Sequence, residues 1–214
     1  TTDATRNVTY KPATGSEHGG DKDAGVIIDG ASTTPVNLRD SYMVLRGLNI
    51  KSQFTAVFLA LTTTGRVLEG LIIGPSTTTG GYTQVREGAD QTVFRNCVFR
   101  NTGAWCVNFN PSTVNGSNSC AFLNCTFFAS TSAIIDQPSV AASVTLLNNL
   151  FLTGSVAYSE HANTTSTGSN NYAAGALSPA ALQGSPYPVT ATTSYSQALE
   201  SGDYAVYMEA TGAL

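Results

Sequence analysis

Acidic and histidine side chains are the groups in this 214-residue chain that could carry acid–base chemistry, and the chain has 14 Asp and Glu and 2 His. Enzymes that cleave polysaccharides place two or three carboxylates together, or set a basic residue beside acids that hold calcium. Here Asp29, Asp40, Asp90 and Asp136 fall at different phases of the sequence repeat, so they should not gather on one face. We therefore predict no catalytic residues and no enzyme activity.

Two short segments place acids close to histidines. Glu160 and His161 could act as an acid–base pair, but no third partner lies near them in sequence, and a solvated surface position is the simpler interpretation. His18 with Asp21 and Asp23 could bind a cation weakly, yet polar loops often have this composition. Four cysteines lack the paired spacing of zinc sites. The sequence predicts no metal site and no cofactor.

Aromatic side chains could instead bind a carbohydrate. Trp105 is the single tryptophan of the chain, on a segment with strand character. If it faces outward near Tyr158, a glycan-binding surface gains support, and if the rings are buried that surface loses support. A glycan partner is therefore an alternative that the position of these two rings decides.

A seven-residue pattern recurs five times and indicates how the side chains are positioned. Its copies VLRGLNI, VLEGLII, VFRNCVF, AFLNCTF and TLLNNLF occupy residues 44–50, 67–73, 93–99, 121–127 and 145–151. The fourth position recurs after 23, 26, 28 and 24 residues. Variable spacing around a short constant segment is typical of a solenoid whose turns are joined by loops of different length.

The second, fifth and seventh positions of the pattern look buried. A strand alternates its faces with period two, so one residue must shift the alternation between positions two and five. The fourth position is always Gly or Asn, the types that enter the left-handed backbone region at least cost, and should be a corner between two short strands. The predicted corner ladder is Gly47, Gly70, Asn96, Asn124 and Asn148, and the predicted core stack is Ile50, Ile73, Phe99, Phe127 and Phe151.

The other positions allow three further predictions. The side-chain amides of the corner asparagines should hydrogen-bond along the stack. Cys97 and Cys125 share the fifth position and should be buried free thiols, because a disulfide between stacked neighbours has an awkward torsion. Arg46, Glu69 and Arg95 share the third position and should form an outward ladder of alternating charge.

The predicted fold is all-β: a single-stranded parallel β-helix (solenoid) of about six turns, about 30 Å long, with a C-terminal extension. Residues 55–61, 104–109, 132–136 and 156–158 should add a further strand to each turn. We predict an N-terminal strand and loop cap at 1–25, the β-helix at 26–172, and a wrap and tail at 173–214. The tail either caps the last turn or contacts a neighbouring subunit, for which Tyr195, Tyr204 and Tyr207 are the candidate interface residues.

Residues 40–50 (DSYMVLRGLNI) resemble a segment common in right-handed parallel β-helix repeat proteins, in which a polar residue precedes Tyr-Val-Val-x-Arg-Gly-Leu-x-Ile. The resemblance extends over about residues 20–172 and implies a right-handed coil. It is specific for the fold and a poor guide to function, because proteins of this fold include pectin-type lyases, hydrolases, tailspikes and plain virion parts.

Composition excludes several classes of partner. Charged residues make up only 11% of the chain, and Thr, Ser, Asn and Gly take their place on the surface. The net charge is −4 and no basic patch is present, so the sequence predicts no nucleic-acid binding. No run of 18 apolar residues occurs, so it predicts no membrane span.

These observations, with the resemblance, predict a non-catalytic structural component of a virion-like assembly. It would be a bacteriophage capsid decoration or cement protein, or a spike or fibre part, located in the particle. Its partners would be copies of itself, in an oligomer such as a trimer, and other structural subunits. The alternatives are a carbohydrate-active or carbohydrate-binding module of the tailspike or polysaccharide-lyase kind, and an extracellular filament or surface subunit that is secreted or lies at the cell surface.

Overall fold

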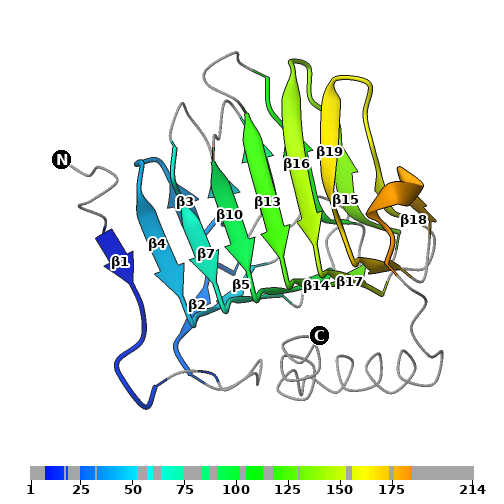
Figure 1. The fold of residues 1–214 in the computed structure, drawn as a ribbon. Coiled ribbons are helices and arrows are strands. Elements are labelled where there is room, and N and C mark those ends of the chain that lie inside the picture. Colours follow the sequence, from blue (N-terminus) through cyan, green and yellow to red (C-terminus); the bar gives the residue numbers. More distant parts are fainter. Residues whose placement is uncertain are drawn as a thin grey trace, which may run out of the picture.

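The chain folds into three parallel sheets that wind around one apolar core (Figure 1). The structure is a computed structural model. It describes residues 8–16, 18, 25–31, 33–52, 57–59, 64–74, 83–86, 91–101, 105–112, 118–129, 131–152, 156–173 and 176–184. The predicted all-β right-handed solenoid is confirmed, and the handedness is the one that crossovers between parallel strands favour.

Each sheet contains seven strands. Sheet 1 consists of β1 (Val8–Tyr10), β4 (Met43–Arg46), β7 (Val67–Glu69), β10 (Thr92–Arg95), β13 (Ser119–Leu123), β16 (Ala142–Leu147) and β19 (Thr164–Ser169). Sheet 2 consists of β2 (Ile27–Asp29), β5 (Asn49–Lys51), β8 (Ile72–Ile73), β11 (Val98–Asn101), β14 (Thr126–Ala129), β17 (Leu150–Phe151) and β20 (Tyr172–Ala173). Sheet 3 consists of β3 (Val36–Leu38), β6 (Val57–Leu59), β9 (Thr83–Arg86), β12 (Trp105–Asn110), β15 (Ser132–Asp136), β18 (Val156–Ser159) and β21 (Ala176–Ser178).

One strand from each sheet makes a rung of the solenoid. The five inner rungs pair with a neighbour on both sides, whereas each of the two end rungs has a partner on one side only within the described part of the chain. The solenoid therefore has about five turns between two end rungs, compared with the six turns predicted. The first and last rungs include β1 and β21, which fall within the segments predicted as N-terminal cap and C-terminal wrap.

The corner between sheets 1 and 2 forms at the fourth position of the repeat. All five predicted corner residues have positive φ, between 53° at Asn96 and Asn124 and 61° at Gly47. Their backbone N–H groups donate to a carbonyl of the next rung, as from Asn124 to Leu147 O at 2.9 Å. A single left-handed residue thus shifts the face alternation without breaking the hydrogen bonding between rungs.

A sixth copy of the pattern, residues 167–173 (TGSNNYA), was not recognised in the sequence. It pairs in register with residues 145–151, and its corner residue Asn170 has φ 56°. The large residues of positions two and seven are replaced by Gly168 and Ala173. The core therefore narrows toward its C-terminal end, which removed the apolar signal from the sequence.

The amide ladder predicted for the corner residues lies one position further along the chain. Asn149 Nδ2 donates to Phe122 O at 2.8 Å and to Asn171 Oδ1 at 2.9 Å, and Asn171 Nδ2 donates to Leu146 O at 2.8 Å. Among the described residues, the side chains of the corner asparagines 96, 124 and 148 form no hydrogen bond. The prediction was wrong because the corner asparagines are only half-buried, whereas the fifth position points into the core.

The core is organised as columns of rings. Phe99, Phe127 and Phe151 are fully buried and stack at 4.8 Å between successive centroids, with interplanar angles of 2° and 11°. Phe94 stacks on Phe122 at 5.0 Å, and this second column meets the first edge-on. Like residues stack because in-register rungs bring each position over the same position of the rung below.

A smaller apolar cluster lies outside the main core, on sheet 2. Ile72, Val98 and Leu152 are buried there, and Phe128 packs against them. The Arg100 guanidinium carbon lies 5.7 Å from the centre of the Phe128 ring, which is within the range of a cation–π contact. Phe127 and Phe128 thus belong to different environments although they are adjacent in the chain.

Candidate functional site

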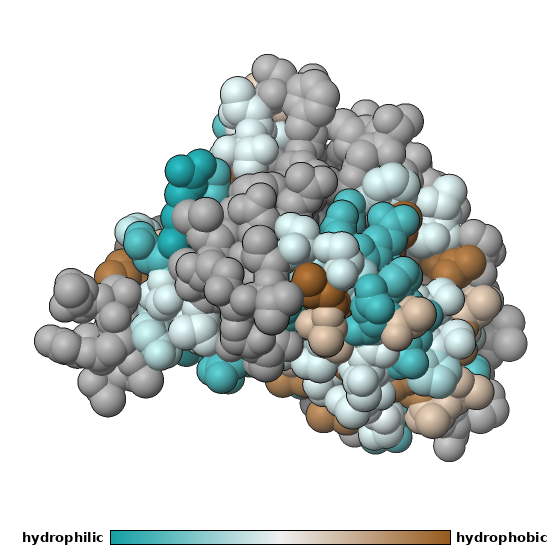
Figure 2. All heavy atoms as spheres, turned by 90° about the horizontal axis from the view of Figure 1, so that it is seen from above, coloured by the Kyte–Doolittle hydropathy of each residue, from teal (hydrophilic) through white to brown (hydrophobic). Residues whose placement is uncertain are grey.

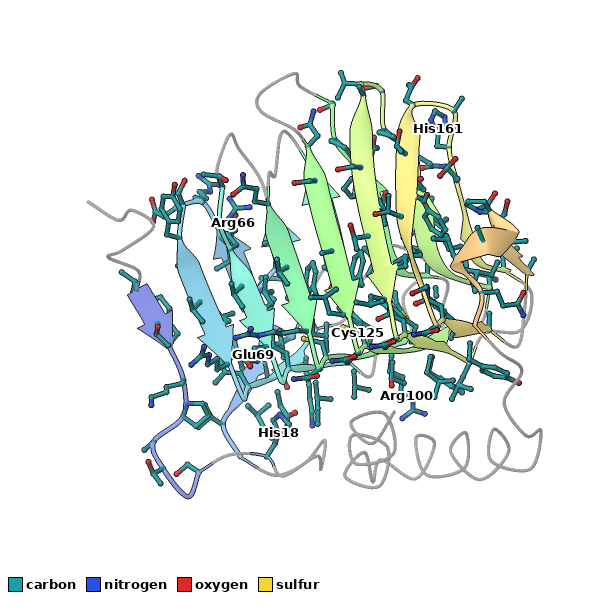
Figure 3. The ribbon with its side chains drawn as sticks, in the orientation of Figure 1. His18, Arg66, Glu69, Arg100, Cys125 and His161 are labelled. Atoms are coloured by element: carbon teal, nitrogen blue, oxygen red, sulfur yellow. The ribbon has the colours of Figure 1, made fainter. Side chains whose placement is uncertain are left out.

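Ionisable side chains lie at separate places on the solenoid. Figure 3 shows His161 near the C-terminal end, Arg66 on the opposite part of the upper edge, and His18 and Glu69 near the lower edge. Among the described residues, no group of three or more His, Cys, Asp or Glu could hold a metal ion. These side chains therefore belong to separate sites, each with its own contacts.

The charge ladder predicted on sheet 1 is confirmed. Glu69 Oε2 lies 2.6 Å from Arg46 Nε and 3.0 Å from Arg95 Nη2, and all three side chains are partly exposed. Their strands are neighbours in register, so the three residues share one outward column. Both arginines contact the carboxylate directly, which makes it a cross-strand tie between three rungs.

The most enclosed polar network joins three strands at the C-terminal end of the solenoid. Asp136 on β15 is 6% exposed and accepts hydrogen bonds from Tyr158 Oη on β18 at 2.8 Å and from Thr164 Oγ1 on β19 at 2.9 Å. The His161 backbone N–H donates to the same carboxylate at 3.1 Å. Tyr158 Oη also lies 2.7 Å from Ser166 Oγ. Sequence reasoning left these residues apart, although separations of 22 and 28 residues match the rung spacing.

The predicted Glu160–His161 pair belongs to the rim of this network. Glu160 Oε2 accepts from the Ser166 backbone N–H at 2.7 Å, and His161 Nδ1 lies 3.2 Å from the Asn163 backbone nitrogen. Asp136 is thus the third partner that the sequence did not reveal, but it contacts the backbone of His161 and not the ring. The two side chains serve the local loop as hydrogen-bond acceptors, which favours a structural role for them.

Burial governs the proton equilibria of this network. Removal from water raises the pKa of Asp136, and the hydrogen bonds from His161 N–H, Tyr158 and Thr164 oppose that shift. Burial also raises the pKa of Tyr158 well above its usual value, with Ser166 opposing and Asp136 adding to the shift. A tyrosine held neutral in this way and a carboxyl saturated by three donors lock β15, β18 and β19 together.

A pH dependence of stability follows from the raised pKa of Asp136. The folded state favours the protonated carboxyl more than the unfolded chain does, so its contribution is full at low pH and is lost as pH rises through the folded pKa. The free energy of unfolding of the wild type minus that of Asp136→Asn should therefore decrease as the pH rises above about 4. Urea unfolding of both proteins across this range measures it, and a difference that grows with pH would contradict the assignment.

Aromatic residues do not form the glycan platform that was considered. Tyr158 is fully buried and belongs to the core, and Trp105 is half-buried with an enclosed indole nitrogen. The carbohydrate alternative depended on both rings being available outside. The carbohydrate alternative therefore loses the support of these two rings.

Two buried basic side chains also have structural contacts. His18 Nε2 lies 2.7 Å from Gly70 O, so this loop residue is fastened to the lower corner of the solenoid, while Asp21 and Asp23 lie outside the described residues. Arg66 is fully buried and donates from Nε to Asp40 O at 3.2 Å. Burial lowers the pKa of Arg66 to about 10, against the opposing influence of Asp40.

The four cysteines are free and buried. Cys97 Sγ and Cys125 Sγ lie 3.3 Å and 3.6 Å from the carbonyls of Leu68 and Phe94, one rung away. Burial raises the pKa of Cys125, and contact with Cys97 adds to the shift. Burial alone raises the pKa of Cys120. Enclosure makes all four thiols poor nucleophiles, and the raised pKa of Cys120 and Cys125 adds to this effect.

The two ends of the solenoid differ sharply. At the C-terminal end a 3-10 turn, η1 (Ala180–Leu182), follows β21 and inserts Leu182 into the core at 2% exposure. Asn171 Nδ2 donates to Leu182 O at 2.8 Å, and the Gly184 N–H donates to Asn171 O at 2.7 Å. The last core position is therefore plugged and the plug is hydrogen-bonded to the ladder.

The N-terminal end has no such plug among the described residues. The exposed large apolar side chains of the described residues all lie there: Val8, Tyr10, Val26 and Ile27, which are 39% to 52% exposed. Among the described strands, β1, β2 and β3 each have a partner on one side only. Tyr10 pairs in register with Leu45, so it occupies an inward column, and no described residue lies beyond it in that column. This open end is the candidate functional surface.

Part of the described surface is weakly polar. Figure 2 shows one face on which pale, weakly polar colours predominate and hydrophobic colour occurs at separate places. In the described part of the chain, no helix is long and apolar enough to cross a membrane. The predicted interface residues Tyr195, Tyr204 and Tyr207 lie outside the described residues. No protein-family model, no curated protein and no solved structure matches the chain.

Proposed function

We propose that this chain is a non-catalytic structural component of a large assembly, docked through the N-terminal end of its solenoid. The observation that carries the proposal is the asymmetry of the two ends. One end is plugged by Leu182, whereas the other presents Val8, Tyr10 and Ile27 beside three strand edges. Open strand edges with apolar side chains promote association, and proteins that stay single cover or charge them.

The physical character of the solenoid suits such a part. A dry core of stacked rings and continuous hydrogen bonding between rungs give rigidity without any bound group. The low share of charged residues lets the weakly polar sides pack closely against neighbours. The resemblance of residues 40–50 to β-helix proteins that include bacteriophage parts supports placing it in a virion-like particle, as a decoration, cement, spike or fibre protein.

Cryo-electron microscopy of the native source material tests the proposal. We expect the chain at symmetric, repeated positions, with the surface around Val8, Tyr10 and Ile27 buried in a contact. A chain found only as a free molecule, with this end facing solvent, would overturn the structural role. Screening of polysaccharides for cleavage and binding would then become the next step.

A further inference from the structure

We infer that the open N-terminal end binds the same end of a second copy, related by a two-fold axis perpendicular to the solenoid. The inference rests on the proposed function, because it takes the open end as the docking surface. It goes further by naming the partner, the strands that meet and the symmetry. The expected product is a head-to-head dimer in which the two solenoids continue one another.

The shape of the end selects the partner. The edges of β1, β2 and β3 surround one apolar core. A partner that pairs with the backbone N–H and C=O groups of all three edges needs three strand edges in the same triangular arrangement. The end of another copy has this outline. Its C-terminal end is occupied by Leu182 and η1, so head-to-tail stacking would require the plug to leave. The N-terminal end of the second copy is therefore the end that can pair with all three edges.

The two-fold axis makes the strands complementary. Turning one solenoid end over reverses the direction in which its strands circulate, so each edge strand meets an antiparallel partner: β1 meets β1 of the second copy, and β2 meets its β3. Antiparallel strands pair readily. An interface in which a strand meets its own copy is self-complementary and closes as a dimer.

The sequence of β1 fits this pairing. Val8, Thr9 and Tyr10 are its three residues, so antiparallel pairing centred on Thr9 places each Val8 opposite Tyr10 of the other copy. Pairs of aromatic and β-branched residues are favourable directly across antiparallel strands. Val8 and Tyr10 match Met43 and Leu45 in the next rung, both of which contact the core. The two pairs would extend the core across the interface.

Charge does not oppose contact between two such ends. The described charged residues of the first two rungs are Lys11, Asp29, Arg39, Asp40, Arg46 and Lys51, and Glu69 of the third rung pairs with Arg46, so both signs are present and nearly balance. Two copies can therefore approach without strong like-charge repulsion. The residues exposed at 39% to 52% supply the apolar surface that association removes from water.

Cross-linking tests the geometry directly. Thr9 lies at the centre of β1, so Thr9→Cys should be joined to itself in high yield by a short bismaleimide, giving a covalent dimer. Ser169→Cys, exposed on β19 at the other end, is the matched control and should stay monomeric under the same treatment. Wild type provides the background, because its four cysteines are buried.

Sedimentation equilibrium of the unmodified protein tests the affinity. Tyr10→Glu should weaken the dimer by at least about 100-fold, because the change enters the interface twice. Thr165→Glu, an equally exposed change on β19, should leave the dimer intact. Circular dichroism checks that both variants fold, which Tyr10 allows because it is 52% exposed.

Each other outcome is decisive. Cross-linking of mixed Thr9→Cys and Ser169→Cys chains, without self-linked Thr9→Cys, would show head-to-tail contact and overturn the inference. A dimer that survives Tyr10→Glu, or a wild type that stays monomeric at high concentration, would also overturn it. If such a monomer is nevertheless found at symmetric positions in a particle with its open end buried, the proposed function stands and only the identity of the partner changes.

Discussion

Phe127→Ala should lower the free energy of unfolding by about 3–5 kcal/mol. The ring is fully buried between Phe99 and Phe151, at 4.8 Å from each, and meets Phe122 edge-on at 5.6 Å. Removing it deletes two stacking contacts and one edge contact and leaves a cavity in the middle of the column. The rungs above and below are held by hydrogen bonds to their neighbours, so they cannot close the gap without breaking register.

Phe128→Ala is the matched control for this measurement. Phe128 is adjacent in the chain and has the same volume, but it is only partly buried, on the outer face of sheet 2 near Arg100. Its removal should cost about 1 kcal/mol, mostly from lost cover of the small outer cluster and the contact with the cation. Urea unfolding followed by circular dichroism compares the two. Equal losses would contradict the assignment of Phe127 to the core, and a larger loss for Phe128→Ala would show that the inward and outward positions on β14 are exchanged.

The repeat was a sufficient guide to the regular part of the fold. Its second and seventh positions are always large and apolar in the five copies, and the conflict between their phases required a one-residue corner at position four. Positive φ at Asn96 and Gly70 shows the local backbone on which that argument depended. The core and corner residues could be predicted because in-register stacking requires the same kind of residue at the same position of every inner rung.

The end rungs could not be predicted in the same way. At the C-terminal end, Gly168 replaces a large residue, because the core narrows there and Leu182 supplies the missing volume from outside the pattern. At the N-terminal end, Tyr10 is 52% exposed although its partner Leu45 in the next rung is buried, so its exposure depends on its place at the end of the described stack and not on its residue type. The repeat pattern describes rungs that have neighbours on both sides, so it does not predict the surroundings of the end rungs.

The polar network was missed for a related reason. Asp136, Tyr158 and Thr164 come from three strands and two sheets, and only the register of successive rungs brings them together. In the sequence, Asp136 was one of several acids at different phases of the repeat, and Tyr158 was a possible glycan-binding ring. Tyr158 and Thr164 follow Asp136 by 22 and 28 residues, which is about the spacing between successive rungs. This spacing is the signal that could have placed them beside Asp136.

Asn149→Ala should lower the free energy of unfolding by about 3–5 kcal/mol, because it leaves buried backbone groups without hydrogen-bond partners. Asn149 is 2% exposed; its Oδ1 accepts from the Cys125 N–H at 2.8 Å, and its Nδ2 donates to Phe122 O and to Asn171 Oδ1. Alanine offers none of these bonds, so the Cys125 N–H and Phe122 O lose these partners. The loss should also loosen the C-terminal plug, since Asn171 holds Leu182.

Asn148, the preceding residue, separates this role from the role of a corner. Asn148→Ala should cost only about 1–2 kcal/mol, because it keeps its backbone bond to Ser169 O and loses mainly the tolerance for φ of 55°. Asn148→Gly should cost less still, since glycine adopts that conformation without strain. Chemical denaturation of the three variants, with hydrogen exchange of the Cys125 amide, measures both effects. If Asn148→Ala were the more damaging change, or if the Cys125 amide stayed protected in Asn149→Ala, the buried ladder would not be what holds the last rungs together.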